Sequence, residues 1–167
     1  MIPLIGIPVD TLLTQILHGL VYGLAYLLVA VGLTIVFGLL GVLNLAHGEL
    51  YMLGAYFGMV VISMIHNFWI ALLIAPILVA VVGYGWEVSV FRPLYGRDPL
   101  YCLIMTFGLS MIFREVALAI WSGEVRSVAA PLPESSPLLG TIYPDYRLFI
   151  LIFSVVVIVI LWLILTR

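Results

Sequence analysis

Lysine is absent from the 167 residues of this chain, and charged side chains of either sign make up only 8% of it. Soluble domains carry about 25% charged residues, which keep their surface in contact with water. Hydrophobic residues reach 65%, so neither a soluble domain nor a disordered chain fits. The net charge of −2, without a basic cluster, excludes nucleic-acid binding. Outer-membrane barrels are disfavoured because their strands alternate apolar and polar residues. The composition therefore predicts a helical membrane protein.

Cysteine is almost absent too, because Cys102 is the only one. An internal disulfide is therefore impossible, and so is a metal site built from cysteines. The phosphate-binding loop of the GxxxxGK[ST] type requires a lysine, so ATP binding in that way is ruled out. The sequence also shows no nucleophile–base arrangement and no paired carboxylates. We therefore expect no catalytic residues, no metal and no cofactor, and a chain that is not itself an enzyme.

Two long runs without any acidic or basic residue mark the membrane-spanning part. Residues 11–48 form a run of 38 residues, and residues 50–86 form a run of 37. A 38-residue helix would be roughly 57 Å long, whereas the hydrocarbon core of a bilayer is about 30 Å thick. Each run must therefore break or turn back.

Glycine and asparagine indicate where the two breaks lie. Glycine destabilises a helix by about 1 kcal/mol relative to alanine, and asparagine can hydrogen-bond its own backbone in a turn. In the first run such residues gather in GLLGVLNLAHGEL, at Gly38, Gly41, Asn44 and Gly48. This predicts a broken or re-entrant segment near residues 38–48. The second run is expected to turn at His66-Asn67, which gives helices near residues 49–65 and 68–91.

The rest of the chain predicts two further spans and two connections. Residues 92–98 hold two arginines, a proline and a glycine and are expected to form a loop before a helix over residues 100–121. Residues 122–146 are rich in proline and carry mixed charges, which predicts an extended connection outside the membrane. Residues 147–166 form the last apolar span. The expected fold is all-α, a single polytopic transmembrane domain over residues 1–167 with about five spans.

The distribution of arginine predicts the orientation of the spans. Arg92 and Arg97 lie in one short loop, which places that loop in the cytoplasm, although it could also contact a partner. The 122–146 connection then lies outside. Counting backwards, the turn at residues 66–67 is outside and the break near residues 38–48 faces the cytoplasmic half. The N-terminus is outside if the first run crosses once and inside if it crosses twice, and we favour one crossing.

Two GxxxG patterns predict close packing of helices. Gly19 and Gly23 form the first pattern, and Gly54 and Gly58 form the second. Small residues at this spacing let two helix backbones approach each other. Packing within one bundle is the favoured interpretation, and contact with a second subunit is the alternative.

The most unusual stretch places Asn44, His47 and Glu49 within six positions of one another. Glu49 is the only acidic or basic side chain between Asp10 and Glu87. An ionised carboxylate is costly inside a membrane, so Glu49 should face the bundle interior or a wet cavity and have a partner.

Three interpretations of this stretch remain open. In the first, Asn44 and Glu49 are structural and satisfy backbone groups freed by the break, with Glu49 at a helix start where the dipole favours an anion. In the second, the break lines a substrate pathway, as discontinuous helices do in other transporters. In the third, His47 and Glu49 bind a metal or relay protons, although a metal needs more than two ligands.

Two segments resemble a known family. The stretch GLTIVFGLLGVLNLAHGELYMLGAYFG, residues 32–58, resembles the signature region of the permease subunits of branched-chain amino acid ABC importers. The stretch VFRPLYGRDPLYCLIMTFGLSMIF, residues 90–113, is similar in its Arg-Pro-Leu loop and in a helix dotted with Thr106, Gly108 and Ser110. Both lie in the expected order and spacing, and the resemblance is closer to the LivH type than to its partner LivM. The related urea and short-chain amide importers have a similar first segment.

The resemblance implies a multi-pass permease subunit of the bacterial inner membrane that translocates leucine, isoleucine or valine. The implied partners are a second permease, two cytoplasmic ATPase subunits that hydrolyse ATP, and a periplasmic substrate-binding protein. Two alternatives remain, namely an importer of urea or short amides, and a stand-alone channel or structural membrane protein. Family members are usually near twice this length, so the chain is expected to be the N-terminal half of a permease.

Overall fold

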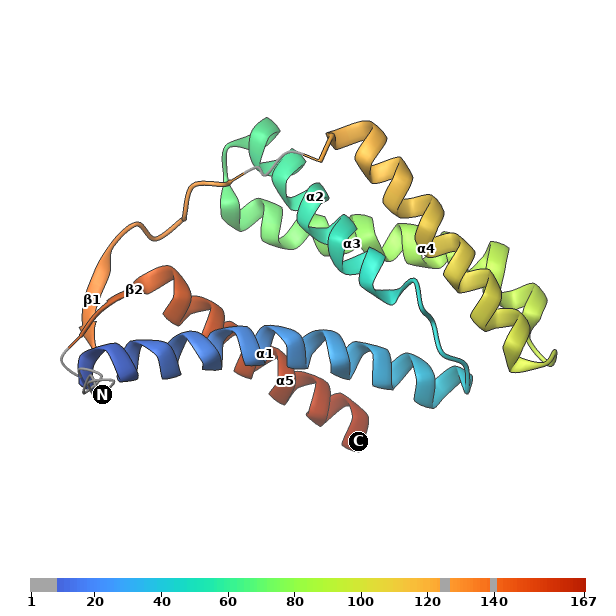
Figure 1. Cartoon of the computed structure of the whole chain (residues 1–167), viewed down its shortest axis with the longest axis horizontal. Helices are drawn as coiled ribbons and strands as arrows, with labels where there is room; N and C mark the ends of the chain where they lie inside the picture. The colour runs from blue at the N-terminus through green and yellow to red at the C-terminus, as the bar shows by residue number, and fades with distance from the viewer. Residues whose placement is uncertain (1–8, 124–126, 139–140) are drawn as a thin grey trace, which may run out of the picture. The chain divides into compact units, whose positions relative to one another are not determined.

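The computed structural model describes residues 9–123, 127–138 and 141–167, and five long helices follow one another in these parts of the chain. They are α1 (Val9–Leu40), α2 (His47–Ile65), α3 (Phe68–Trp86), α4 (Pro99–Trp121) and α5 (Asp145–Thr166), coloured from blue to red in Figure 1. All five are long and apolar enough to cross a membrane. The predicted all-α polytopic fold with about five spans is therefore confirmed.

The first predicted break is present and is shorter than expected. α1 ends at Leu40, and Gly41 follows with a φ of +67° while its amide donates to the carbonyl of Phe37 at 2.8 Å. Glycine suits this left-handed position because it has no Cβ. α2 begins at His47, so only residues 41–46 are non-helical and the outer glycines of the predicted 38–48 segment belong to helices.

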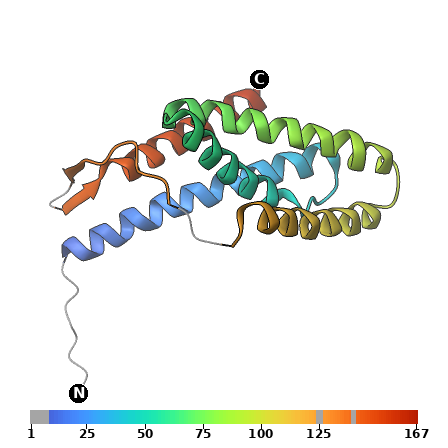
Figure 2. The same ribbon diagram turned by 90° about the horizontal axis from the view of Figure 1, so that it is seen from above.

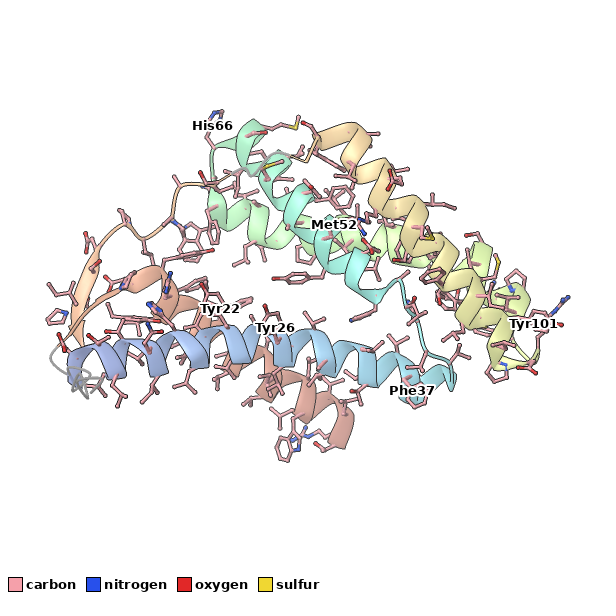
Figure 3. All side chains as sticks on the ribbon, in the orientation of Figure 1. Tyr22, Tyr26, Phe37, Met52, His66 and Tyr101 are labelled. Carbon is pink, nitrogen blue, oxygen red and sulfur yellow. The ribbon has the colours of Figure 1, made fainter. Side chains whose placement is uncertain are left out.

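The second predicted break, at His66-Asn67, is also confirmed. His66 ends α2 in the left-handed conformation, with a φ of 56°, and is labelled at this turn in Figure 3. Asn67 then starts α3, because its side chain accepts hydrogen bonds from the amides of Trp69 and Ile70 at 2.9 and 3.2 Å. An asparagine at the N-cap satisfies donors that a helix start leaves free.

Two connections differ from the sequence-based expectation. After α3 the chain stays helical through a π-helical turn, η1 (Glu87–Phe91), and a 3-10 turn, η2 (Arg92–Leu94). The predicted loop at residues 92–98 is therefore helical in its first part. The predicted extended connection before α5 contains an antiparallel hairpin of β1 (Ser135–Leu138) and β2 (Thr141–Pro144). Short strands that pair only with each other carry too weak a pattern to be found from sequence.

Packing divides the chain into two compact units. One contains Met1–Ala30 and Ala129–Arg167, and the other contains Val31–Val128. In the second unit α2 lies against α3 and α4, as the view from above in Figure 2 also shows. Its buried core is formed by Ala46, Leu53, Trp86 and Phe91, and the Trp86 ring meets the Phe113 ring edge-on at 4.4 Å between centroids.

Large apolar side chains cover much of the surface. Tyr22 and Tyr26, labelled in Figure 3, project from α1, and Tyr26 is 73% exposed. Leu73 on α3 and Trp162 on α5 are exposed as well. Soluble monomers rarely expose such surface, which agrees with helices that face lipid or other membrane subunits.

Candidate functional site

The break between α1 and α2 is organised by the side chain of Asn44. Its Oδ1 accepts a hydrogen bond from the amide of Ala46 at 3.0 Å, and its own carbonyl accepts from the amide of His47 at 3.2 Å. Asn44 is only 6% exposed, and Ala46 is fully buried. Asparagine can bond its own backbone two residues on, which offers the chain a turn in place of a helix. The residue thus supplies a buried acceptor where regular structure supplies none.

A threonine of α4 provides a second attachment for the break. The amide of Leu45 donates to Thr106 Oγ1 at 3.2 Å, and the Thr106 hydroxyl donates in turn to the carbonyl of Leu103 at 3.1 Å. Thr106 has no exposed surface. An amide of the break is therefore satisfied by a buried side chain of α4.

Glu49 is bound by α4 as well. The Ser110 hydroxyl donates to Glu49 Oε1 at 2.8 Å. In the described chain no side chain caps the first turn of α2. The structural interpretation placed both Asn44 and Glu49 on freed backbone groups, but only Asn44 makes such a bond, whereas Glu49 joins two helices.

His47 lies against α1, where Gly32 leaves room for its ring. A Cβ built on Gly32 would come within 3.2 Å of His47 Nε2 and 3.3 Å of Cε1, which is tighter than ordinary contact. His47 Nδ1 is buried and has no hydrogen-bond partner among the described residues. At this break the Glu49 side chain therefore bonds Ser110 of α4, whereas the His47 ring lies against Gly32 of α1.

The described residues offer no group of three or more His, Cys, Asp or Glu side chains that could hold a metal ion. Within that part of the chain, a metal at His47 and Glu49 would gain no further ligand of these types. Thr106 and Ser110 were not singled out as site residues from the sequence. The available signal was two hydroxyl residues four positions apart in an otherwise apolar helix.

The two GxxxG patterns have different surroundings. A Cβ on Gly54 would lie 3.6 Å from Val79 Cγ2, and one on Gly58 would lie 3.9 Å from Ala75 Cβ. This pair therefore faces α3. A Cβ on Gly19 or Gly23 would meet nothing within 4 Å in the described structure.

The turn between α3 and α4 exposes its two arginines. Arg92 and Arg97 are exposed, and the Asp98 carboxylate accepts from the amide of Leu100 at 2.9 Å to start α4. The Tyr95 hydroxyl donates to Glu87 Oε1 at 2.9 Å. Partial burial, together with this bond to a carboxylate, raises the pKa of Tyr95 above its usual value.

A polar cluster in the other unit joins residues that lie far apart in the sequence. The hydroxyl of Tyr143 and His18 Nδ1 form a hydrogen bond at 3.0 Å, and Arg147 Nη1 donates to the same imidazole, 3.0 Å from its Nε2. Tyr143 is completely buried. These residues connect β2 and α5 to α1. His18 lies more than a hundred positions from both partners, so no local pattern in the sequence indicated these contacts.

Comparison with known proteins gives a consistent family. The model described as "Branched-chain amino acid transport system / permease component" matches residues 15–167. The high-affinity branched-chain amino acid transport system permease protein BraD of Pseudomonas aeruginosa is 32% identical over 130 residues, which cover 72% of this chain and 42% of BraD. The LivH permease of Escherichia coli is 35% identical over 129 residues, covering 71% of this chain and 41% of LivH.

The chain spans about two-fifths of the length of the curated relatives it matches. No solved structure matches it. The five apolar helices and the permease relatives make it a multi-pass protein of the inner membrane. Because the family model matches nearly all of the sequence, the chain belongs to the permease component family of branched-chain amino acid transport systems.

Proposed function

We propose that this chain is part of the membrane-spanning permease of an ABC importer that carries leucine, isoleucine and valine into the cell. The observation that supports the proposal is the family match over residues 15–167, together with relatives named as high-affinity branched-chain amino acid permeases. A second permease would complete the pathway, two cytoplasmic ATPases would hydrolyse ATP, and a periplasmic binding protein would deliver the substrate.

The break at residues 41–46 is our proposed part of the substrate pathway. A polar group that is buried in a membrane bundle is costly unless it is satisfied, so an unsatisfied one points to a function. Asn44 and Thr106 are buried and satisfied, whereas His47 Nδ1 has no partner in the described chain. Discontinuous helices in transporters present unwound backbone and polar side chains to the substrate near the middle of the bilayer. His47 is therefore one group proposed to face the pathway, and Glu49, the only acidic or basic residue between Asp10 and Glu87, is the other.

In this mechanism ATP binding in the partners rocks the permease between outward-open and inward-open states. The protein's own part is to keep the polar break intact while the surrounding helices move. The exposed turn with Arg92 and Arg97, which the arginine bias predicts to be cytoplasmic, would give the partners a polar surface to bind.

The test is uptake by the importer assembled with its partner subunits in sealed vesicles. Labelled leucine should accumulate only with ATP and binding protein, and unlabelled isoleucine and valine should compete while urea and acetamide should not. Competition by urea or acetamide alone would replace the proposed substrate with an amide. Leucine movement that needs no ATP and no partner would favour a stand-alone channel and overturn the proposal.

A further inference from the structure

Two side chains of α4 bind the break and the first turn of α2 in a regular pattern. Thr106 accepts from the amide of Leu45 at 3.2 Å, and Ser110 donates to Glu49 at 2.8 Å. The two residues of each pair are 61 positions apart. Leu45 and Glu49 are therefore four residues apart, as are Thr106 and Ser110. We call these two contacts the α4 rungs.

The geometry of α4 explains the pattern. Residues four positions apart lie on the same face of a helix, one turn above each other. Thr106 and Ser110 therefore point to the same neighbour, and the partly buried Leu50 and Leu109 pack on the same core. The α4 rungs are thus two polar contacts within an apolar interface.

The amide of Leu45 in the break depends on the hydroxyl of Thr106 rather than on a backbone carbonyl of the break. Leu45 lies outside both helices, and its amide is satisfied by a hydroxyl that belongs to α4. An amide that loses its acceptor inside a membrane bundle destabilises the fold, because little water is there to replace that acceptor. A shift of α4 must therefore either carry the break with it or leave this amide unsatisfied.

We propose that Thr106 and Ser110 are positioning residues for transport, which fasten the polar break to α4 so that the two move as one body between the states of the importer. This inference rests on the proposed function. Neither side chain needs to touch the substrate, since both act through the backbone of Leu45 and the carboxylate of Glu49.

The first experiment compares Thr106→Val with Thr106→Ser in the assembled importer. Valine keeps the shape and loses the hydroxyl, so kcat for leucine uptake should fall about tenfold or more. KM should stay within about twofold, because the lost contact is not made to substrate. Serine keeps the hydroxyl and should retain most of the rate. A residue that acts only by packing would give the reverse order and would overturn the proposal.

Hydroxyl deletions on other helices show whether the effect belongs to the α4 rungs or to the loss of any hydroxyl. Thr14→Val removes a hydroxyl that donates to the Asp10 carbonyl of its own helix, and it should leave uptake unchanged. For the second rung, Ser110→Ala and Glu49→Leu should be non-additive in kcat at equal membrane abundance, because each removes the same contact. Ser63→Ala removes a hydroxyl that donates to the Val60 carbonyl, and its effect should add independently to that of Glu49→Leu.

A second readout does not require transport. Leu43 is 47% exposed in the break, so Leu43→Cys, with Cys102 replaced by serine, reports on how firmly the break is held. Thr106→Val should raise its thiol-labelling rate severalfold, whereas Thr106→Ser should not. If the parent importer fails to carry leucine but labelling follows this order, the proposed function fails and the fastening stands. Equal labelling in all three proteins, at equal membrane abundance, would overturn the fastening itself.

Discussion

Asn44→Ala should destabilise the chain more than Asn67→Ala, although Asn67 makes more hydrogen bonds. Asn44 is buried and its single acceptor serves the buried amide of Ala46, whereas Asn67 is exposed and serves two amides of α3. Asn44→Ala leaves an amide unsatisfied, which should lower the free energy of unfolding by about 1–3 kcal/mol. The void left by the side chain should cost about one further kcal/mol. The exposed cap should cost about 1 kcal/mol, because water can replace it.

The expected difference is therefore between about 2–4 kcal/mol for Asn44→Ala and about 1 kcal/mol for Asn67→Ala. It can be measured as the free energy of unfolding in mixed micelles, followed by tryptophan fluorescence. Asn44→Ser serves as the matched control, since a hydroxyl can accept the same backbone bond more weakly, and its loss should be intermediate. Equal losses for the two alanine variants would refute the reasoning, because burial would then not decide the cost.

Three further predictions concern orientation and the break. In a cysteine-free chain, a cysteine at Arg97 should be labelled only from the cytoplasmic side and one at Ser135 only from outside, and labelling on the opposite sides would reverse the orientation. Gly32→Ala should force the His47 imidazole to move by a few tenths of an ångström and should lower the melting temperature. Gly23→Ala should not lower it, and melting curves of the two variants would show the difference. Glu49→Leu should lower the folded yield and Glu49→Gln should not, by size-exclusion chromatography, because only glutamine can still accept the bond from α4. Full uptake by an importer that carries Glu49→Leu would refute a role for the carboxylate.

The spans and both breaks followed from local information. A charge-free run longer than the bilayer cannot remain one straight span, and Gly41 and Asn67 have conformational or hydrogen-bonding preferences that act within a few residues. The start of α2 was misplaced by two residues, since Asn44 completes its turn earlier than the position of Glu49 suggested. The hairpin before α5 was missed because its strands are short and proline-rich, so no alternating pattern stands out.

By itself the amino-acid sequence determined that the chain is a helical membrane protein with a polar break in an uncharged region. It could not determine what the polar groups at that break bind. Glu49 and Ser110 are 61 positions apart, and from the sequence any of the apolar helices could have packed beside Glu49. The same holds for His18, whose partners lie more than a hundred positions away. Tertiary packing alone decided these pairs, since a buried donor or acceptor bonds whatever group the neighbouring helix places within about 3 Å.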